Sequence, residues 1–387
     1  MQRFDVLVVG AGPAGSTAAY RLAEAGASVL LADKARFPRD KPCGGGLTMR
    51  AVRQLPFSVE SVVEDRASSV RLGLDFNARF ERKTERPLVL MTQRSRLDAC
   101  LAEHAARAGA EFQDGARVND LELLDEGVRA TVNGHKVAAS WLLCADGVNG
   151  TSSRAIGLDG DRTYGVALEG NVPYGVVAED EYRGRLFLEL ANVPGGYGWV
   201  FPKGDHVNVG VGGWEREGPR LRQHLARFCR EYGIQESSLE NVRGYRLPLL
   251  HARARLAKGR AALLGDAAGL VDPLSGDGIY EAFLSAKLAT EAVVVGELEA
   301  YDRELRRALS SQLAAAWGAK VALDRFPRLT YAVVRTPYLW KAVESLIGGE
   351  VPSPSAMRGF RRASMRMVEA IARAAGNPGK PYKVART

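Results

Sequence analysis

The alternation of apolar and polar positions at the start of the chain predicts a parallel βαβ unit. Phe4 to Val9 is a short, β-branched apolar run that is typical of a buried parallel strand. Gly15 to Ala25 follows with helix-forming residues at helical spacing, and Ala27 to Ala32 supplies a second strand that ends at Asp33. The order strand, tight turn, helix and strand is that of one βαβ unit, which spans about 30 residues.

The middle of the chain changes from this pattern to one of short strands. Residues 58–90 alternate between polar and apolar and predict strands, whereas Ser95 to Ala108 has the spacing of an amphipathic helix. Another buried strand, Ser140 to Ala145, ends at Asp146-Gly147. Between about residues 160 and 250 short strands and turns predominate, so we expect an inserted antiparallel sheet there.

The last third returns to buried-strand and helical patterns. Arg260 to Leu264 is a strand candidate, and a long helix is expected from about Ile279 to Leu298. Beyond about residue 300 the chain is helical and amphipathic, with breaks expected at Pro327, Pro337, Pro352 and Pro354. The fold class that follows is α/β, a Rossmann-type nucleotide-binding fold with an inserted antiparallel sheet and a C-terminal helical region.

The chain of 387 residues is long enough for more than one structural unit. We expect a discontinuous nucleotide-binding domain made of residues 1–160 and 255–300, with part of 50–95 contributing to the substrate sheet. Residues 160–255 are then the substrate or catalytic domain, and 300–387 the C-terminal helical region.

The formal charge of +8 is concentrated toward the end of the chain, at Arg303 to Arg307 and Arg358 to Arg366. A solvated basic face is favoured over a device for binding an anionic membrane or nucleic acid, and no nucleic-acid motif is present. No stretch reaches about 18 uninterrupted apolar residues, so any membrane contact is expected to be peripheral. The amphipathic stretch Tyr331 to Ile347 is the candidate for that contact, with packing against the core as its alternative.

Cysteine usage indicates the cytoplasm. The four cysteines are widely spaced and form no CxxC pair, which favours free thiols in a reducing compartment and gives no pattern for a metal site.

A glycine-rich turn between the first strand and the first helix carries the first chemistry. Its sequence is Gly10-Ala11-Gly12-Pro13-Ala14-Gly15. Gly10 permits the tight turn, Gly12 lets the backbone approach a pyrophosphate, and Gly15 lets the helix pack closely on the strand. Asp33, at the end of the second strand, can accept hydrogen bonds from ribose hydroxyls. The pattern predicts a dinucleotide site but does not choose between FAD and NAD.

Three segments downstream make that choice. Ala145-Asp146-Gly147 and Gly265-Asp266-Ala267-Ala268-Gly269 each end a strand, and Gly276-Asp277-Gly278-Ile279 opens a helix. Together these segments resemble the p-hydroxybenzoate hydroxylase-like flavoproteins. The resemblance implies that Asp266 contacts the ribityl chain of FAD and that Gly278 and Ile279 lie near the flavin O2. For Asp146, an ordinary turn aspartate is the alternative to a place in this flavoprotein signature.

Two further segments narrow the resemblance to the geranylgeranyl reductase family. They are Lys41-Pro42-Cys43-Gly44-Gly45-Gly46, and Pro194 to Gly204 (PGGYGWVFPKG), which matches the family pattern PxxYxWxFP. The resemblance implies that Cys43 lies beside the isoalloxazine as a reactive cysteine, with an inert loop residue as its alternative, and that Arg94 contacts FAD. The FAD-binding residues that it implies are Gly10, Gly12, Ala14, Gly15, Asp33, Lys34, Cys43, Gly44, Arg94, Val118, Asp266, Gly278 and Ile279.

Three aromatic residues in the second segment alternate along the chain. Tyr197, Trp199 and Phe201 are spaced so that a strand presents them on one face. Such a wall can guide a polyprenyl chain across a flavin, and ordinary core packing is its alternative. Cys43, Tyr197 and Trp199 are therefore the catalytic candidates, and the three aromatics are the substrate-binding candidates.

The resemblance implies an FAD-dependent enzyme that saturates carbon–carbon double bonds of a geranylgeranyl or other polyprenyl chain. NADPH or ferredoxin is the expected electron donor, because one dinucleotide fingerprint leaves no separate NADPH domain. Two alternatives stay open: an aromatic monooxygenase or halogenase that keeps the flavin, and a non-catalytic prenyl-lipid carrier.

Overall fold

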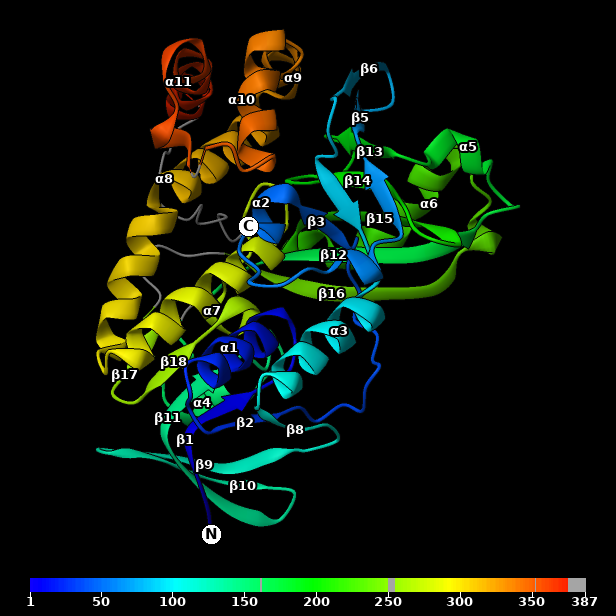
Figure 1. Cartoon of the computed structure of the whole chain (residues 1–387). Helices are drawn as coiled ribbons and strands as arrows, with labels where there is room; N and C mark the ends of the chain where they lie inside the picture. Colours follow the sequence, from blue (N-terminus) through cyan, green and yellow to red (C-terminus); the bar gives the residue numbers. More distant parts are fainter. Residues whose placement is uncertain (161, 250–254, 352, 375–387) are drawn as a thin grey trace.

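The computed structural model describes residues 1–160, 162–249, 255–351 and 353–374. Its first sheet contains the expected βαβ unit (Figure 1). The strands follow in the spatial order β17 (Ala257–Lys258), β18 (Ala261–Leu263), β11 (His135–Cys144), β1 (Gln2–Val9), β2 (Val29–Ala32) and β8 (Glu111–Gln113). All but β17 run parallel, and the hairpin β9 (Val118–Leu124) and β10 (Gly127–Val132) extends β11 in the antiparallel sense.

Helices α1 (Pro13–Glu24), α3 (Arg94–Arg107) and α7 (Ile279–Val294) pack side by side against this sheet (Figure 1). Val6, Leu7 and Val8 have no exposed surface, although neighbouring residues of a strand point to opposite faces. Both faces of β1 are therefore covered, which explains why its sequence is a continuous apolar run.

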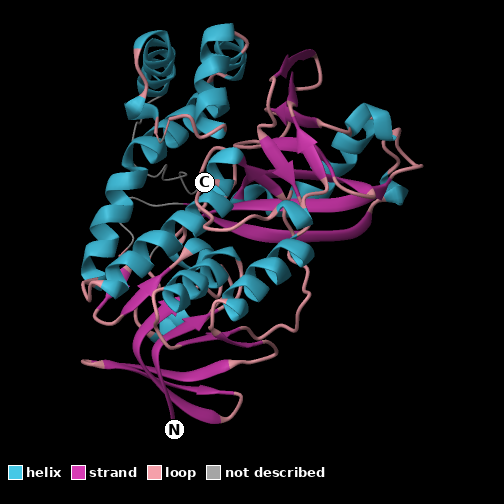
Figure 2. Cartoon of the chain, in the orientation of Figure 1, coloured by secondary structure: helices cyan, strands magenta, loops and turns pink. Residues whose placement is uncertain are grey.

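The second sheet lies on the right of the upper half of Figure 2, and the C-terminal helices lie on the left. Its strands follow in the order β16 (Glu240–Leu249), β12 (Thr163–Pro173), β15 (His206–Trp214), β14 (Tyr197–Pro202), β13 (Arg185–Leu190), β5 (Ser69–Leu74) and β6 (Ala78–Lys83). The sheet is mixed rather than purely antiparallel as expected, because β13 pairs with β5 in the parallel sense. The hairpin β5–β6 comes from a distant part of the chain, so no tight turn fixes its direction against β13.

One face of the second sheet is covered by helix α6 (Leu221–Glu231). Val166, Leu168 and Val209 on this face pack with Leu225 and Phe228 of the helix in one apolar cluster. The opposite face of the same strands carries the remaining alternate residues, and it borders the cavity described below. The short helix α5 (Glu179–Tyr182) precedes β13 at the edge of this sheet.

A small third sheet connects the two larger ones. It consists of β3 (Gly46–Thr48), β7 (Val89–Met91) and β4 (Asp65–Ala67), with the short helices α2 (Met49–Val52) and α4 (Ser152–Ala155) elsewhere in the connecting segments. The strand β3 directly follows the Cys43 loop, so the third sheet holds one end of that loop.

Helices form the C-terminal region, as expected. The helix expected to run to Leu298 ends at Val294 instead, because Gly296 adopts a positive φ of 79° that ends a helix. The chain continues through α8 (Leu298–Arg325), α9 (Pro327–Val334), α10 (Pro337–Ile347) and α11 (Gly359–Ala374). Pro327 and Pro337 begin new helices as expected, Pro354 begins a 3-10 turn, and Pro352 lies outside the described residues.

Candidate active site

A cavity of about 530 Å³ lies between the two large sheets. It is lined by the glycine-rich turn, by the loop that contains Cys43, by the aromatic residues of β14, and by the segment that leads into α7. Residues predicted from four distant parts of the sequence therefore border one space. A volume of this size is typical of a cofactor or ligand site.

The three fingerprint glycines have different surroundings. Gly10 has a φ of 99°, and a Cβ there would lie 2.4 Å from the Ala145 carbonyl oxygen. A Cβ at Gly15 would lie 1.8 Å from the Gly10 carbonyl oxygen, so both glycines are required by the packing of helix and strand. A Cβ at Gly12 would meet nothing closer than Arg39 at 3.5 Å. The space above Gly12 therefore suits the close approach of a ligand, at the uncapped N-terminus of α1.

Asp33 and Lys34 directly follow β2 of the first sheet, and both line the cavity. The Asp33 carboxylate accepts hydrogen bonds from the Ala11 and Ala35 N–H groups, both at 2.8 Å. A second cavity of about 320 Å³ shares Gly10, Asp33 and Lys34 with the first and is also lined by Val118. All of these predicted nucleotide-binding residues therefore border connected space.

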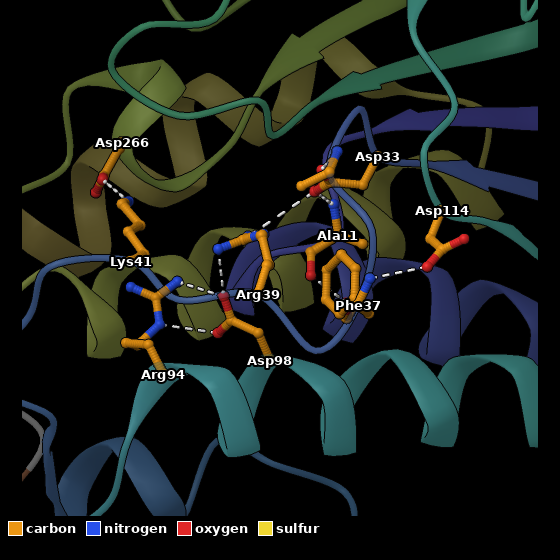
Figure 3. A network of polar contacts seen from close by, with 11 residues as sticks. Ala11, Asp33, Phe37, Arg39, Lys41, Arg94, Asp98, Asp114 and Asp266 are labelled. Atoms are coloured by element: carbon orange, nitrogen blue, oxygen red, sulfur yellow. Dashed lines mark hydrogen bonds and ion pairs between the residues drawn. The ribbon is translucent and has the colours of Figure 1, made fainter.

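Arginine and aspartate side chains form a network beside the fingerprint (Figure 3). Arg94 donates from Nε and Nη2 to the two oxygens of Asp98 at 2.8 and 2.7 Å. Arg39 pairs with Asp98 at 2.9 Å and reaches Asp33 at 3.8 Å. Arg94 is buried and lines the cavity, whereas Arg96 is exposed and pairs with Glu64. Arg39 was not predicted, and its charge in the Arg36–Lys41 segment was the only available signal.

Asp266 lines the cavity from a 3-10 turn after β18, and Lys41 pairs with it at 2.7 Å (Figure 3). Burial alone would raise the pKa of Asp266, but the charge and hydrogen bond of Lys41 hold it below its usual value. Gly278 and Ile279 also line the cavity, at the N-terminus of α7. The carboxylate and the helix terminus therefore face the same space, as the resemblance implies.

The loop with Cys43 is pressed against the cavity-facing side of β14. A Cβ at Gly44 would lie 2.8 Å from Cδ2 of Phe201, and Gly45 has a φ of 67°. Lys203 Nζ donates to the carbonyl oxygens of Gly44 and Thr92. Glycine is therefore needed at both positions, so that the loop can lie flat on the aromatic strand.

Tyr197, Trp199 and Phe201 form one row along β14, and all three line the cavity. Neighbouring ring centroids are 5.9 and 6.2 Å apart. The Tyr197 hydroxyl donates to the Ser275 carbonyl, and Trp199 Nε1 donates to Asn208 Oδ1 at 2.8 Å. The expected single-faced row is therefore present, and its polar atoms are held by protein partners.

Several cavity residues were not predicted from the sequence. Glu169 on β12, Tyr245 on β16 and Lys320 on α8 all line the cavity. Glu169 Oε1 accepts the Cys43 N–H at 2.7 Å. Burial raises the pKa of Glu169 to about 7 and lowers the pKa of Lys203 to about 8. No local motif marks these residues, since strand register brings Glu169 and Tyr245 to the cavity and helix packing brings Lys320 there.

The turn role left open for Asp146 agrees with the structure. Its carboxylate accepts hydrogen bonds from the Thr151 N–H at 2.8 Å, and from the N–H and hydroxyl of Ser152.

The four cysteines differ in exposure. Cys144 and Cys229 are fully buried, whereas Cys43 and Cys100 are partly exposed. Within the described residues, no group of three or more His, Cys, Asp or Glu is arranged to hold a metal ion.

The family model described as "FAD binding domain" matches residues 3–289. Menaquinone reductase of Mycolicibacterium smegmatis is 33% identical over 77% of this chain and 78% of that protein. Digeranylgeranylglycerophospholipid reductase 1 of Methanopyrus kandleri is 32% identical over 75% of this chain and 80% of that protein.

Solved structures agree with the fold. A geranylgeranyl bacteriochlorophyll reductase-like protein of Thermoplasma acidophilum superposes with a TM-score of 0.80, at 22% identity, over 97% of this chain and 98% of that one. The flavin-dependent brominase Bmp2 superposes with a TM-score of 0.78, at 20% identity, over 96% of this chain and 100% of that one. At these identities the likeness concerns the fold alone.

The fold and the cavity define an FAD-dependent oxidoreductase of the p-hydroxybenzoate hydroxylase-like group. Within that group, the chain belongs to the geranylgeranyl reductase family. FAD is its cofactor, and the open space above Gly12 at the N-terminus of α1 fits the phosphate groups of that cofactor.

Proposed function

We propose that this protein uses FAD to saturate carbon–carbon double bonds of a polyprenyl chain. The observation that carries the proposal is the row of Tyr197, Trp199 and Phe201, which forms an aromatic wall beside the Cys43 loop in the same cavity as the fingerprint. The reductases of digeranylgeranyl and geranylgeranyl groups among the relatives support this substrate class. The substrate is a prenyl diphosphate, a prenylated lipid, a chlorophyll precursor or the tail of a quinone.

The cofactor residues are proposed from their positions. Gly10, Gly12 and Ala14 line the cavity and hold the pyrophosphate end, and Gly15 supports them by letting α1 pack on β1. Asp33, Lys34 and Val118 hold the adenosine end, and Arg94 and Asp266 hold the middle of FAD. Cys43, Gly44, Gly278 and Ile279 border the flavin ring. Bound there, FAD supplies a hydride to the substrate.

The chain's own residues orient the substrate and exclude water. An isolated alkene has no polar group to bind, so shape must position it, and the flat rings of the β14 row suit a branched apolar chain. Leu186, Leu188, Val89 and Met91 also line the cavity and add apolar wall. A dry site of this kind favours proton and hydride transfer to the alkene over reaction with water.

The electron donor is NADPH or ferredoxin. A single dinucleotide fingerprint is present in the sequence, so we propose that NADPH docks transiently or that an acidic carrier protein delivers electrons to the basic surface. Stopped-flow reduction of the bound FAD by each donor separates the two.

We further propose a cytoplasmic location with peripheral membrane contact. No described helix is both long and apolar enough to cross a membrane. Within the stretch Tyr331 to Ile347, which the sequence indicated for this contact, the side chains of Tyr331 and Trp340 are buried and cannot contact a membrane. The exposed apolar side chains of this region are instead Phe326, Leu329, Tyr338, Phe360 and Met367. Sedimentation with phosphatidylglycerol vesicles tests the contact, and Y338S/F360S should reduce it.

The function is tested under anaerobic conditions. The flavin is reduced with dithionite, geranylgeranyl diphosphate or a geranylgeranylated lipid is added, and flavin reoxidation and product mass are followed. Reoxidation without oxygen, together with a mass gain of about two units for each bond reduced, supports prenyl reduction.

Other outcomes favour the two alternatives. A flavin that stays reduced until air is admitted favours a monooxygenase or halogenase, which is compatible with the fold likeness to the brominase. A protein that binds the prenyl compound without any flavin chemistry favours the carrier.

A further inference from the structure

Saturation of an alkene needs a proton as well as a hydride. One carbon of the double bond receives the hydride, and the other receives a proton from a group that must lie at the cavity, hold a proton near neutral pH, and exchange it with water afterwards. The side chain that meets these requirements is that of Glu169 on β12, which no sequence motif marks.

Glu169 lies on the cavity-facing side of the second sheet, on β12 between β16 and β15. In the strand register it is paired with Gly210 of β15 and Arg243 of β16, and Trp199 of β14 is paired with the same Gly210. A Cβ at Gly210 would lie 2.2 Å from Cζ2 of Trp199, so the indole covers that glycine beside Glu169. The residue is 6% exposed and lines the cavity. Its carboxyl group therefore lies in an aromatic wall, next to the place proposed for the substrate.

The same carboxyl group holds the Cys43 loop. Glu169 Oε1 accepts the Cys43 N–H at 2.7 Å, which places the carboxyl directly beside the loop expected to border the flavin. This contact joins two residues that are 126 positions apart in the sequence.

Burial and the neighbouring charges set the pKa of Glu169 close to neutral pH. Burial raises its pKa to about 7, opposed by the Cys43 N–H, by the positive charge of Lys203 and by Asn208, while Asp40 of the Cys43 loop raises it further. Arg243 of β16 pairs with Asp40 at 2.9 Å. The Tyr245 hydroxyl, also on β16, keeps its proton because burial raises its pKa well above the usual value. Glu169 is thus partly protonated at neutral pH.

Four other ionisable side chains of the cavity, those of Asp266, Arg94, Lys320 and Tyr197, have fixed partners. Asp266 is paired with Lys41, and Arg94 with Asp98. Lys320 Nζ donates to the Gly195 carbonyl, and the Tyr197 hydroxyl donates to the Ser275 carbonyl. The proton of Tyr197 is therefore engaged by a backbone carbonyl, in contrast to that of Glu169.

We propose that Glu169 is the proton donor of the reaction, an inference that rests on the proposed prenyl reduction. One alkene carbon forms a C–H bond with the hydride from the reduced flavin, which is oxidised. The π electron pair forms the second C–H bond with the proton of Glu169, whose O–H bond breaks. The carboxylate that remains takes a proton from water before the next turnover.

The test compares E169Q with a matched buried carboxyl on the same sheet. Glutamine keeps an oxygen for the Cys43 N–H but cannot donate an acidic proton. Glu189 on β13 is fully buried, accepts the Phe76 N–H at 2.6 Å, and is not part of the cavity wall, so E189Q is the control. Both variants are loaded with FAD, and reoxidation of the reduced flavin by geranylgeranyl diphosphate is followed without oxygen between pH 5 and 9.

E169Q should slow reoxidation by about 10²–10⁴-fold and lose the decline in rate that the wild type shows as pH rises through neutrality. E189Q should keep both the rate and the profile, and E169D should recover part of the rate. A second readout needs no turnover: infrared difference spectra of the oxidised protein should show a protonated carboxyl band that titrates near pH 7 and is absent in E169Q alone.

Two failures are distinguishable. If the wild type does not reoxidise with any prenyl substrate, the proposed function itself fails, and the donor role fails with it. If the wild type reacts and E169Q reacts within about two-fold of it with the same pH profile, only the assignment of Glu169 is overturned.

Discussion

Lys320 and Asp324, one turn apart on helix α8, bind opposite backbone groups of the same residue, Gly195. The Gly195 N–H donates to Asp324 Oδ1 at 2.9 Å, and Lys320 Nζ donates to the Gly195 carbonyl. Asp324 Oδ2 also accepts Trp214 Nε1 at 3.2 Å. The C-terminal helical region therefore holds the start of the segment that carries Tyr197, Trp199 and Phe201.

The contacts of Lys320 and Asp324 with Gly195 act as a clamp, and its removal should loosen the aromatic row of Tyr197, Trp199 and Phe201. D324A takes away a charged acceptor, so we expect a loss of about 1–3 kcal/mol in the free energy of unfolding. KM for the prenyl substrate should rise more than kcat falls, and FAD affinity should stay unchanged. R303A, at an exposed position of the same helix, is the control. Equal KM values for D324A and R303A would count against the clamp.

The Cys43 loop should not tolerate a side chain at Gly44. In G44A the new Cβ would lie 2.8 Å from Phe201, so we expect a cost of about 1–3 kcal/mol and slower flavin reoxidation. In the F201A background the clash is absent, so G44A/F201A should be about as stable as F201A alone. Thermal unfolding and reoxidation rates measure both effects. G218A, which would meet nothing within 4 Å, should behave as the wild type. If G44A costs as much stability in the F201A background as in the wild type, the clash lies elsewhere.

Stability should depend on pH through Glu169. Burial raises the folded-state pKa of Glu169 from 4.5 to about 7. Its contribution to the free energy of unfolding is therefore fully present below about pH 4.5 and is lost as pH rises through about 7. Relative to the wild type, E169Q should gain up to about 3 kcal/mol between pH 4.5 and pH 8. Urea unfolding of both flavin-loaded proteins at several pH values measures this difference. Parallel curves for the two proteins would contradict the raised pKa.

Cys43 should be the thiol whose modification FAD controls. It is partly exposed and lines the cavity, whereas Cys144 and Cys229 are fully buried. Iodoacetamide should modify Cys43 in the apoprotein, and added FAD should slow this by about tenfold or more because the cofactor covers the loop. Cys100, partly exposed outside the cavity, is the internal control in the same mass spectrum. Equal protection of Cys43 and Cys100 would argue against a position beside the cofactor.

Arg94 should matter for folding as well as for FAD. R94M leaves the fully buried Asp98 with Arg39 as its remaining charged partner, and we expect a cost of about 3–5 kcal/mol. Arg96 is exposed, and its partner Glu64 keeps hydrogen bonds from the Gln93 side chain and the Gly204 N–H, so R96M should cost less than R94M. Thermal unfolding of the apoproteins compares them without the cofactor. Similar midpoints for the two variants would show that Asp98 does not depend on Arg94.

Local patterns were sufficient for the elements and for much of the cavity. The run Phe4–Val9 became β1, and the expected strand spacing placed Tyr197, Trp199 and Phe201 on one face of β14. Such patterns succeed because turns, helix starts and strand alternation depend on neighbours in the sequence. The end of α7 at Val294 was missed, although Gly296 offered a local signal for it.

The sequence by itself determined the fold class, the dinucleotide turn and the presence of an aromatic strand. Tertiary structure alone decided that Glu169 meets Cys43, that Lys41 meets Asp266, and that Lys320 lies at the cavity. These contacts join residues that are far apart in the chain, and they depend on strand register and helix packing rather than on neighbouring residues. The pKa values that follow from burial depend on the same packing, which no single segment of the sequence contains.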